Sequence, residues 1–262
     1  MENYLEKAEL RLAHIAKHLD LEDSIERKVY NIVHNVGNPI ACALGLSSHA
    51  KAKAMYAWFK DRDIEAFRQW CYVAAKLDQL WYRLEDSTIN SGARLLQLLK
   101  PFVSNNNEVI EWFMNNDSVY DAKRIANHKT RDFFAYQAII ALRGDWPKLI
   151  ARCELVLSDP PKSSSEKKYA IDHEFYLALG QGDIEGMKKV ICSLVTSKAL
   201  RTRYEDESGF TKDLISTYAV IYSKIALRHG YDVKVDSPYI PLEWLDNDPL
   251  EKYETHYSFL KP

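Results

Sequence analysis

The chain has 262 residues, of which 47% are hydrophobic and 27% charged, and its formal net charge at pH 7 is −2. This is the composition of a globular protein with enough apolar side chains for a sizeable core. A nearly neutral chain has no long-range electrostatic attraction to nucleic acid or to an anionic membrane, so we expect neither as a partner.

The N-terminal stretch, MENYLEKAELRLAHIAKHL, mixes acidic, basic and apolar residues as an amphipathic helix does. A secretory signal would instead need a basic start followed by an unbroken apolar core. No stretch of the chain reaches the ~18 consecutive apolar residues of a membrane span. The four cysteines lie far apart among apolar neighbours and are predicted to be buried free thiols: Cys42, Cys71, Cys153 and Cys192. Together these features predict a cytoplasmic protein.

Hydrophobic residues recur at a helical spacing through the first half of the chain, and only nine Gly and nine Pro interrupt the whole sequence. Gly37-Asn38-Pro39 is typical of a helix end, because glycine accepts the left-handed cap conformation and proline cannot continue the hydrogen-bond ladder. After a first helix that includes Leu5 and Leu19, we predict helices over roughly 24–36, 50–60, 64–85, 91–102, 108–114 and 119–128.

The second half repeats one pattern, in which a helix is followed by a tight Gly-Asp turn and a second amphipathic helix. FFAYQAIIALRGDW turns at Gly144-Asp145, and HEFYLALGQGDI turns at Gly182-Asp183, roughly 38 residues later. Aligning the two turns pairs three apolar positions of the following helices: Leu149 with Met187, Cys153 with Ile191, and Leu157 with Val195. Asp63 occupies a similar place earlier in the chain. Each aspartate is predicted to cap the second helix of an αα-hairpin through the free N–H groups of that helix.

After Gly230 the sequence changes to YDVKVDSPYIPLEWLDNDPLEKYETHYSFLKP, in which Pro238, Pro241 and Pro249 exclude a long helix. We expect an irregular segment that runs over the surface, with a short helical turn near Leu242–Leu245 and at most a trivial strand near Val233–Val235. A further loop is predicted at Ser158–Ser165, where two prolines and several serines join two helices.

These patterns predict an all-α fold. We expect an array of antiparallel helix pairs, about twelve helices in all, that resembles a degenerate helical repeat and ends in an irregular Pro-rich C-terminal segment. A single helical domain over residues 1–262 is expected; the alternative is a subdivision into N-terminal helices (1–130) and repeat-like hairpins with the tail (131–262).

The sequence contains few patterns that indicate chemistry. His14 and His18 lie four residues apart on one predicted helix, a spacing that suits two ligands of a metal ion, but no third ligand accompanies them and a solvated pair is the preferred interpretation. The sequence has no phosphate-binding glycine loop, no nucleophile elbow and no singled-out pair of carboxylates. We therefore predict a protein that is not an enzyme, with no catalytic residues, no metal and no cofactor.

Aromatic and acidic residues are the better indication of function. Sixteen Tyr and six Trp are available either to anchor a protein interface or to fill gaps between helices. From Asp236 onward the chain carries six acidic side chains against two lysines. Acidic patches steer and hold basic partners, although solvated loops have the same composition. The predicted partner-binding residues are Trp244, Asp246, Asp248, Glu251, Tyr253 and Glu254 in the tail, and the second acidic cluster, Glu205, Asp206 and Glu207.

The second half of the chain resembles the bacterial immunity protein 49 family. The resemblance runs from about Phe133 to Leu245 and is carried by AIIALRGDWPKL, the following CELVL, FYLALGQGD and KIALRHGYDVKVDSPYIPLEWL. It implies an all-helical cytosolic protein that is encoded beside a polymorphic toxin, such as one delivered by type VI secretion, and protects the producing cell by binding that toxin. It assigns no individual binding residues.

Two functions follow as hypotheses. The first is an immunity protein that neutralises a cognate toxin, for example a basic nuclease, by stoichiometric binding. The second is a helical-repeat adaptor or chaperone that binds several protein partners through its concave face. If the tail is not the surface that recognises the toxin, the concave face around Tyr136 and Tyr176 is the alternative binding surface. For the tail, its large rings must either dock back on the helices or face a partner. The oligomeric state is not predicted.

Overall fold

The computed structural model describes residues 2–85 and 93–261, and all regular structure in these residues is helical. The predicted all-α fold is therefore confirmed, and residues 233–235, where at most a trivial strand was expected, form no strand. In chain order, the helices are α1 (Glu2–Ala16), α2 (Glu22–Val33), α3 (Pro39–Phe59), α4 (Ile64–Leu84), α5 (Arg94–Gln97), α6 (Leu99–Ser104), α7 (Asn107–Asn115), η2 (Asp117–Val119), α8 (Ala122–Ala126), α9 (Arg131–Arg143), α10 (Trp146–Ser158), α11 (Ser164–Lys167), α12 (Ala170–Gln181), α13 (Ile184–Leu194), α14 (Ser197–Thr202), η3 (Tyr204–Asp206), α15 (Thr217–Arg228), η4 (Leu242–Trp244) and η5 (Ser258–Leu260).

The two predicted Gly-Asp turns form the hairpins α9–α10 and α12–α13. Gly144 and Gly182 end the first helix of each pair in the left-handed conformation, with φ of +67° and +72°. The aspartate that follows then caps the second helix, because the carboxylate of Asp183 accepts a hydrogen bond from the Gly186 N–H at 2.9 Å. Glycine is favoured at these positions because a Cβ would strain a backbone with positive φ.

The register predicted for the hairpins is confirmed at the positions nearest the turn. Leu149 of α10 and Met187 of α13 are both fully buried, as is Phe67 at the corresponding position of α4. Asp63 caps α4 through the N–H of Ala66 at 2.9 Å, so α3 and α4 form a third, longer hairpin. A carboxylate cap of this kind stabilises a helix by about 1 kcal/mol.

Two helix boundaries differ from the prediction because a capping residue begins a new helix there. Pro39 begins α3 and does not merely follow α2, because Asn38 accepts a hydrogen bond from the Ala41 N–H at 3.0 Å and proline has no N–H to lose in a first turn. In place of the helix predicted over 119–128, the structure has η2 and α8. The carboxylate of Asp121 accepts hydrogen bonds from the N–H groups of Lys123 and Arg124 and so begins α8 as a new helix.

The helix predicted over 91–102 begins, within the described residues, with α5, and is divided at Leu98 into α5 and α6. Ser91, the predicted start, lies outside the described residues. The loop predicted at Ser158–Ser165 is shorter than expected, because α11 begins at Ser164.

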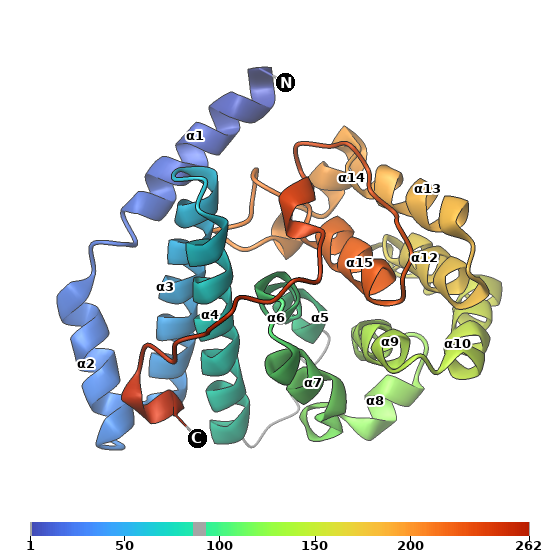
Figure 1. Ribbon diagram of the computed structural model, residues 1–262. Coiled ribbons are helices and arrows are strands. Elements are labelled where there is room, and N and C mark those ends of the chain that lie inside the picture. Colours follow the sequence, from blue (N-terminus) through green and yellow to red (C-terminus); the bar gives the residue numbers. More distant parts are fainter. Residues whose placement is uncertain (1, 86–92, 262) are drawn as a thin grey trace.

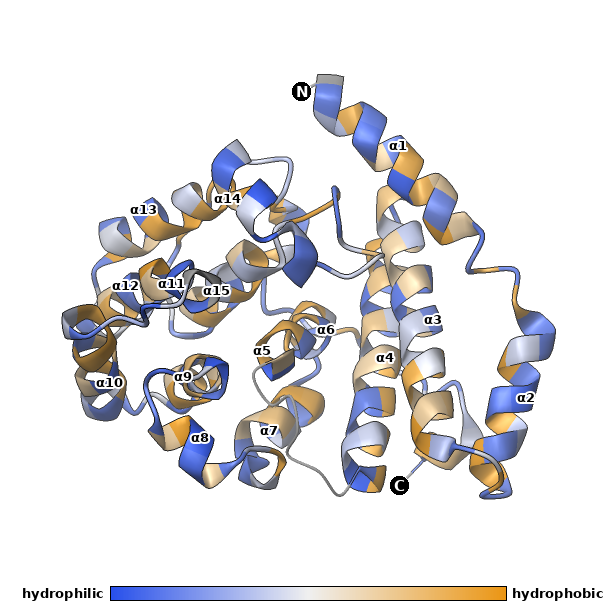
Figure 2. Cartoon of the chain, turned by 180° about the vertical axis from the view of Figure 1, so that it is seen from behind, coloured by the Kyte–Doolittle hydropathy of each residue, from blue (hydrophilic) through white to orange (hydrophobic). Residues whose placement is uncertain are grey.

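The helices are arranged in two groups that share one core. Figure 1 shows α1–α4 on one side, the hairpins α9–α10 and α12–α13 on the other, and α5–α7 and α15 between them. Seen from behind, α5 and α6 in the middle are mostly apolar, whereas α2 at the edge carries many hydrophilic residues (Figure 2). Most of the buried apolar side chains form one continuous cluster, whose members run from Ala8 to Leu260.

One prediction about the cysteines is wrong. Cys42, Cys71 and Cys153 are buried, but Cys192 is exposed. The reason is helical periodicity: Ile191 and Leu194 take the inward face of α13, which turns the intervening position toward solvent.

Candidate functional site

The residues after α15 form a C-terminal tail, residues 231–261, that replaces the second helix of a hairpin. Gly230 has a φ of +83° and turns the chain back, after which the tail runs across α4 (Figure 1). Two 3₁₀ turns interrupt the irregular part: η4, as predicted for Leu242–Leu245, and η5 near its end. The tail therefore connects the last helix of the chain with the N-terminal group of helices.

Trp244 is the main apolar anchor of the tail. Its side chain is 1% exposed and stacks on Phe67 of α4, with ring centroids 4.2 Å apart and an interplanar angle of 17°. The ring of Trp58 on α3 lies 6.2 Å away on a second side. Of the two alternatives for this ring, docking on the helices is the one observed, so Trp244 presents no surface to a partner.

Asp246 is the polar anchor. Its carboxylate pairs with Arg68 of α4 and accepts a hydrogen bond from the Asn105 side chain at 2.6 Å. Its backbone carbonyl accepts a hydrogen bond from Lys224, which also donates to the Asn105 side chain at 2.6 Å. Burial of the Lys224 side chain lowers its pKa to about 7. Asp246 therefore holds α4, α15 and the end of α6 together.

Tyr253 and Glu254 attach the next part of the tail. The Tyr253 hydroxyl donates to the Ser104 carbonyl at 2.5 Å, and its ring lies 4.9 Å from that of Tyr72. The backbone of Glu254 exchanges two hydrogen bonds with the Gln69 side chain, at 2.7 and 3.1 Å. These bonds use the main chain of Glu254 and leave its carboxylate exposed.

The outward side chains of the tail border an acidic groove. This groove has a volume of about 450 Å³ and lies between the start of α4 and the tail; its lining residues are Asp63, Glu65, Ala66, Gln69, Leu250, Glu251, Lys252 and Glu254. Four carboxylates thus face one lysine. Asp248, which precedes the tail residues of the groove, is exposed, and its backbone carbonyl accepts hydrogen bonds from Arg68 and Asn105. An arrangement of this kind attracts positively charged groups.

The second predicted acidic cluster is divided by the fold. Glu205 is exposed, with only a 3.5 Å contact to Lys212. Asp206 accepts hydrogen bonds from the Tyr169 hydroxyl and from Lys168, both at 2.9 Å. Glu207 accepts from the Thr217 N–H at 2.8 Å, and burial raises the pKa of its carboxyl. Of these three residues, Glu205 is exposed and the other two are half-buried, and none of them lines the acidic groove.

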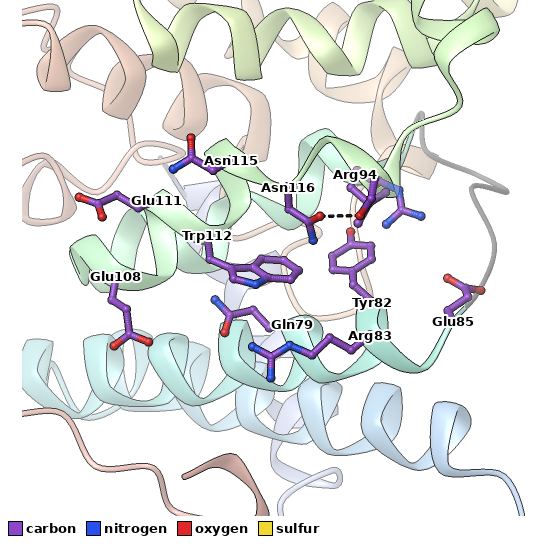
Figure 3. Close-up of a pocket in the computed structure, with 12 residues that line it drawn as sticks. Gln79, Tyr82, Arg83, Glu85, Arg94, Glu108, Glu111, Trp112, Asn115 and Asn116 are labelled. Carbon is purple, nitrogen blue, oxygen red and sulfur yellow. Dashed lines mark hydrogen bonds between the residues drawn. The ribbon is translucent and has the colours of Figure 1, made fainter. Parts of the chain in front are cut away.

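A larger cleft lies elsewhere on α4 and was not predicted from the sequence. This α4–α7 cleft has a volume of about 870 Å³ and is lined by Gln79, Tyr82, Arg83, Glu85, Arg94, Glu108, Glu111, Trp112, Asn115, Asn116, Ser118 and Val119 (Figure 3). A signal for it exists in the sequence. Glu108, Trp112 and Asn115 recur at the spacing of one helix face, and a largely polar face that includes a tryptophan is unusual for a helix packed on a core.

The remaining residues that the sequence singled out are two tyrosines and a pair of histidines. Tyr136 and Tyr176, expected on a concave face, are 5% and 0% exposed and belong to the core. The rings of His14 and His18 contact each other with centroids 4.8 Å apart. Over residues 2–85 and 93–261, no group of three His, Cys, Asp or Glu side chains is placed to hold a metal ion.

The structure also bears on membrane insertion. In the part of the chain that the structure describes, none of the helices combines the length and the apolar character needed to span a bilayer.

Comparison with known proteins supports the resemblance seen in the sequence. Residues 129–244 match the family model of immunity protein 49, so the C-terminal half of the chain is similar to that family, as predicted. The matched segment extends from α9 to η4 and ends at Trp244. No curated protein and no solved structure matches the chain. The acidic groove and the α4–α7 cleft both lie outside the matched residues.

Proposed function

We propose that this protein is an immunity protein that binds a cognate toxin protein in a stoichiometric complex and thereby neutralises it. The observation that carries the proposal is the match of residues 129–244 to immunity protein 49. Neutralisation by binding needs an accessible surface with a chemical preference. The acidic groove offers such a surface, because Glu65, Glu251 and Glu254 project from two segments that the tail anchors hold in place.

A basic toxin, such as a nuclease with a positively charged substrate site, fits this surface. Complementary charges speed the encounter of two proteins and lose this effect as salt screens them beyond about 10 Å. The protein would then act either by filling the active site of the toxin or by blocking its substrate. Trp244 and Asp246 attach the tail to the helices, and this supports binding in both cases, because a surface that is already held in place loses little conformational entropy when it binds.

The basic experiment pairs this chain with the toxin encoded by the neighbouring gene. Co-expression of the two should restore growth that the toxin alone stops, and the purified proteins should form a complex with a dissociation constant near the nanomolar range. Absence of both protection and complex would contradict the proposal. Weak binding to several unrelated proteins would instead support the adaptor hypothesis.

A charge-reversal variant tests the surface. Asp248, Glu251 and Glu254 are changed to Lys together, while Asp246 is left intact because its carboxylate holds Arg68 and Asn105. We expect the association rate with the toxin to fall by about tenfold or more at low ionic strength. The free energy of unfolding should stay unchanged.

The matched control reverses the same number of charges on another face. Glu154, Glu174 and Glu185 are exposed on α10, α12 and α13, and their change to Lys alters the net charge equally. Equal association rates for the two triple variants would show that the acidic groove is not the recognition surface.

A further inference from the structure

The α4–α7 cleft is built from two helix faces that meet at one end and diverge at the other. Lys76 of α4 and Glu108 of α7 form an ion pair of 3.2 Å at the narrow end. Beyond it, Gln79 and Arg83 continue the face of α4, and Trp112 projects from α7 into the opening (Figure 3).

Two polar groups on the α4 side have no partner. Gln79 is 2% exposed and its amide nitrogen makes no hydrogen bond, and the hydroxyl of Tyr82, which is 7% exposed, makes none either. Figure 3 shows both side chains rising from α4 beneath Trp112 and Asn116. Buried polar groups are almost always paired in folded proteins, so two unpaired groups beside one cleft indicate a ligand that pairs with them.

The α7 side offers an aromatic ring between carboxylates. Trp112 is partly exposed, and Glu108 and Glu111 are exposed on the same helix face. Arg94 is 4% exposed and lies over the Tyr82 ring at 4.2 Å, so its charge is covered. Glu85, at the end of α4, adds a third carboxylate to the lining of the cleft, and Arg83 adds an exposed guanidinium. Because Glu108 is paired with Lys76, Glu111 is the exposed carboxylate of α7 that is left for a ligand.

A guanidinium group fits these features better than other side chains do. It is planar and stacks on aromatic faces, and its five N–H donors can serve several acceptors at once. The chain uses the same contact internally, where Arg152 lies 3.5 Å from the centre of the Phe133 ring. The oxygen and nitrogen of the Gln79 amide can exchange places by rotation, so that Gln79 and Tyr82 both present an acceptor.

We propose that the α4–α7 cleft binds an arginine side chain of a protein partner. The guanidinium stacks on Trp112, pairs with Glu111, and donates hydrogen bonds to Gln79 and Tyr82. Identification of that partner as the toxin rests on the proposed function, whereas the recognition of arginine does not. The cleft would give a second contact with a basic protein, separate from the acidic groove at the start of α4.

Arginine recognition is tested without any toxin. The probe is N-acetyl-arginine methylamide, and the readout is the set of indole N–H signals in a two-dimensional NMR spectrum, with the Trp112 signal assigned from a Trp112→Phe variant. We expect a saturable shift of the Trp112 signal with a dissociation constant on the order of millimolar, and much smaller shifts of the other tryptophans.

The control ligand is N-acetyl-citrulline methylamide, which has the same shape without the charge. It should bind at least about threefold more weakly, as should the arginine probe with Glu111→Gln, whereas Glu154→Gln on α10 should leave binding unchanged. No shift of the Trp112 signal, or equal binding of the charged and neutral probes, would overturn the proposal.

The toxin is tested separately. Glu111→Lys is used in place of a Trp112 truncation, because Trp112 packs against Phe113 at 5.0 Å and its removal would disturb folding. We expect Glu111→Lys to weaken the complex with the neighbouring gene product by about tenfold or more, mainly through faster dissociation. If the wild-type protein binds the toxin and Glu111→Lys binds it equally well, the cleft does not contact the toxin. If the wild-type protein binds no toxin, the proposed function fails while the arginine result stands on its own.

Discussion

The helix hairpins of the C-terminal half and the tail that follows them are held in place by different kinds of contact. In α9–α10 and α12–α13, apolar positions repeat at helical spacing, and a glycine and an aspartate define each turn within a few residues. The tail has no repeat, and it depends on single side chains such as Trp244 and Asp246 that reach partners far away in sequence. A hairpin distributes its stability over many positions, whereas the tail concentrates it at a few.

The largest expected effect comes from removing the apolar anchor of the tail. Trp244→Ala should lower the free energy of unfolding by about 3–5 kcal/mol, because it leaves a cavity against Phe67. Leu242→Ala in the same turn is the control, since Leu242 is 42% exposed and should cost less than about 0.5 kcal/mol. Urea unfolding of both variants measures the difference. Similar losses at the two positions would mean that the tail is held along its whole length and not at Trp244.

An intermediate effect is expected from pH, through the buried lysine beneath the tail. The pKa of Lys224 is lowered from 10.5 to about 7, chiefly by burial, with Arg68, Arg228, Asp246 and Asp248 as its charged neighbours. Between these two values the unfolded chain binds more protons than the folded one, so the free energy of unfolding rises with pH. Below pH 7 the full cost of the buried charge is present.

The Lys224→Met variant isolates this contribution. Relative to the variant, the wild-type protein should gain about 1 kcal/mol per pH unit between roughly pH 7 and 9.5, because one pKa unit corresponds to about 1.4 kcal/mol. Urea unfolding at several pH values measures the two curves, and all other ionisable groups are common to both proteins. Parallel curves would show that the lysine keeps its charge when buried.

The smallest effect concerns the hairpin turns and sharpens the comparison between them. Asp183→Ala should lower the free energy of unfolding by about 1 kcal/mol, because its carboxylate caps α13 at 2.9 Å. Asp145→Ala should cost less, since the corresponding bond to the Lys148 N–H is 3.4 Å long. Thermal unfolding of the two variants gives the order of the effects. A larger loss at position 145 would contradict this explanation of cap strength.

Much of the candidate site could not be predicted from the sequence. Acidity and aromatic content indicated the tail, yet the same pattern describes Asp246, which is bound by Arg68, and Glu251, which lines the groove. The α4–α7 cleft could not be predicted because its two faces come from segments about 30 residues apart. The packing of one helix against another is not encoded in the local sequence of either helix.

What the sequence by itself determined is local. The all-α fold, the Gly-Asp turns, the buried register of Leu149 and Met187 and the short turn before Trp244 all depend on residues within one or two helical turns of each other. Backbone conformation and helix periodicity act over that range, so composition and spacing are sufficient.

Only the tertiary structure decided which of the chemically similar residues face solvent. Glu205, Asp206 and Glu207 are adjacent and all acidic. The Tyr169 hydroxyl, 37 positions away, donates a hydrogen bond to Asp206, and the Thr217 N–H donates one to Glu207. The tail likewise docks Trp244 on Phe67 and leaves Glu251 and Glu254 outward. The physical reason is that burial of a polar or aromatic group depends on whether a partner from a distant segment is in place to satisfy it, and that is a property of the packed chain.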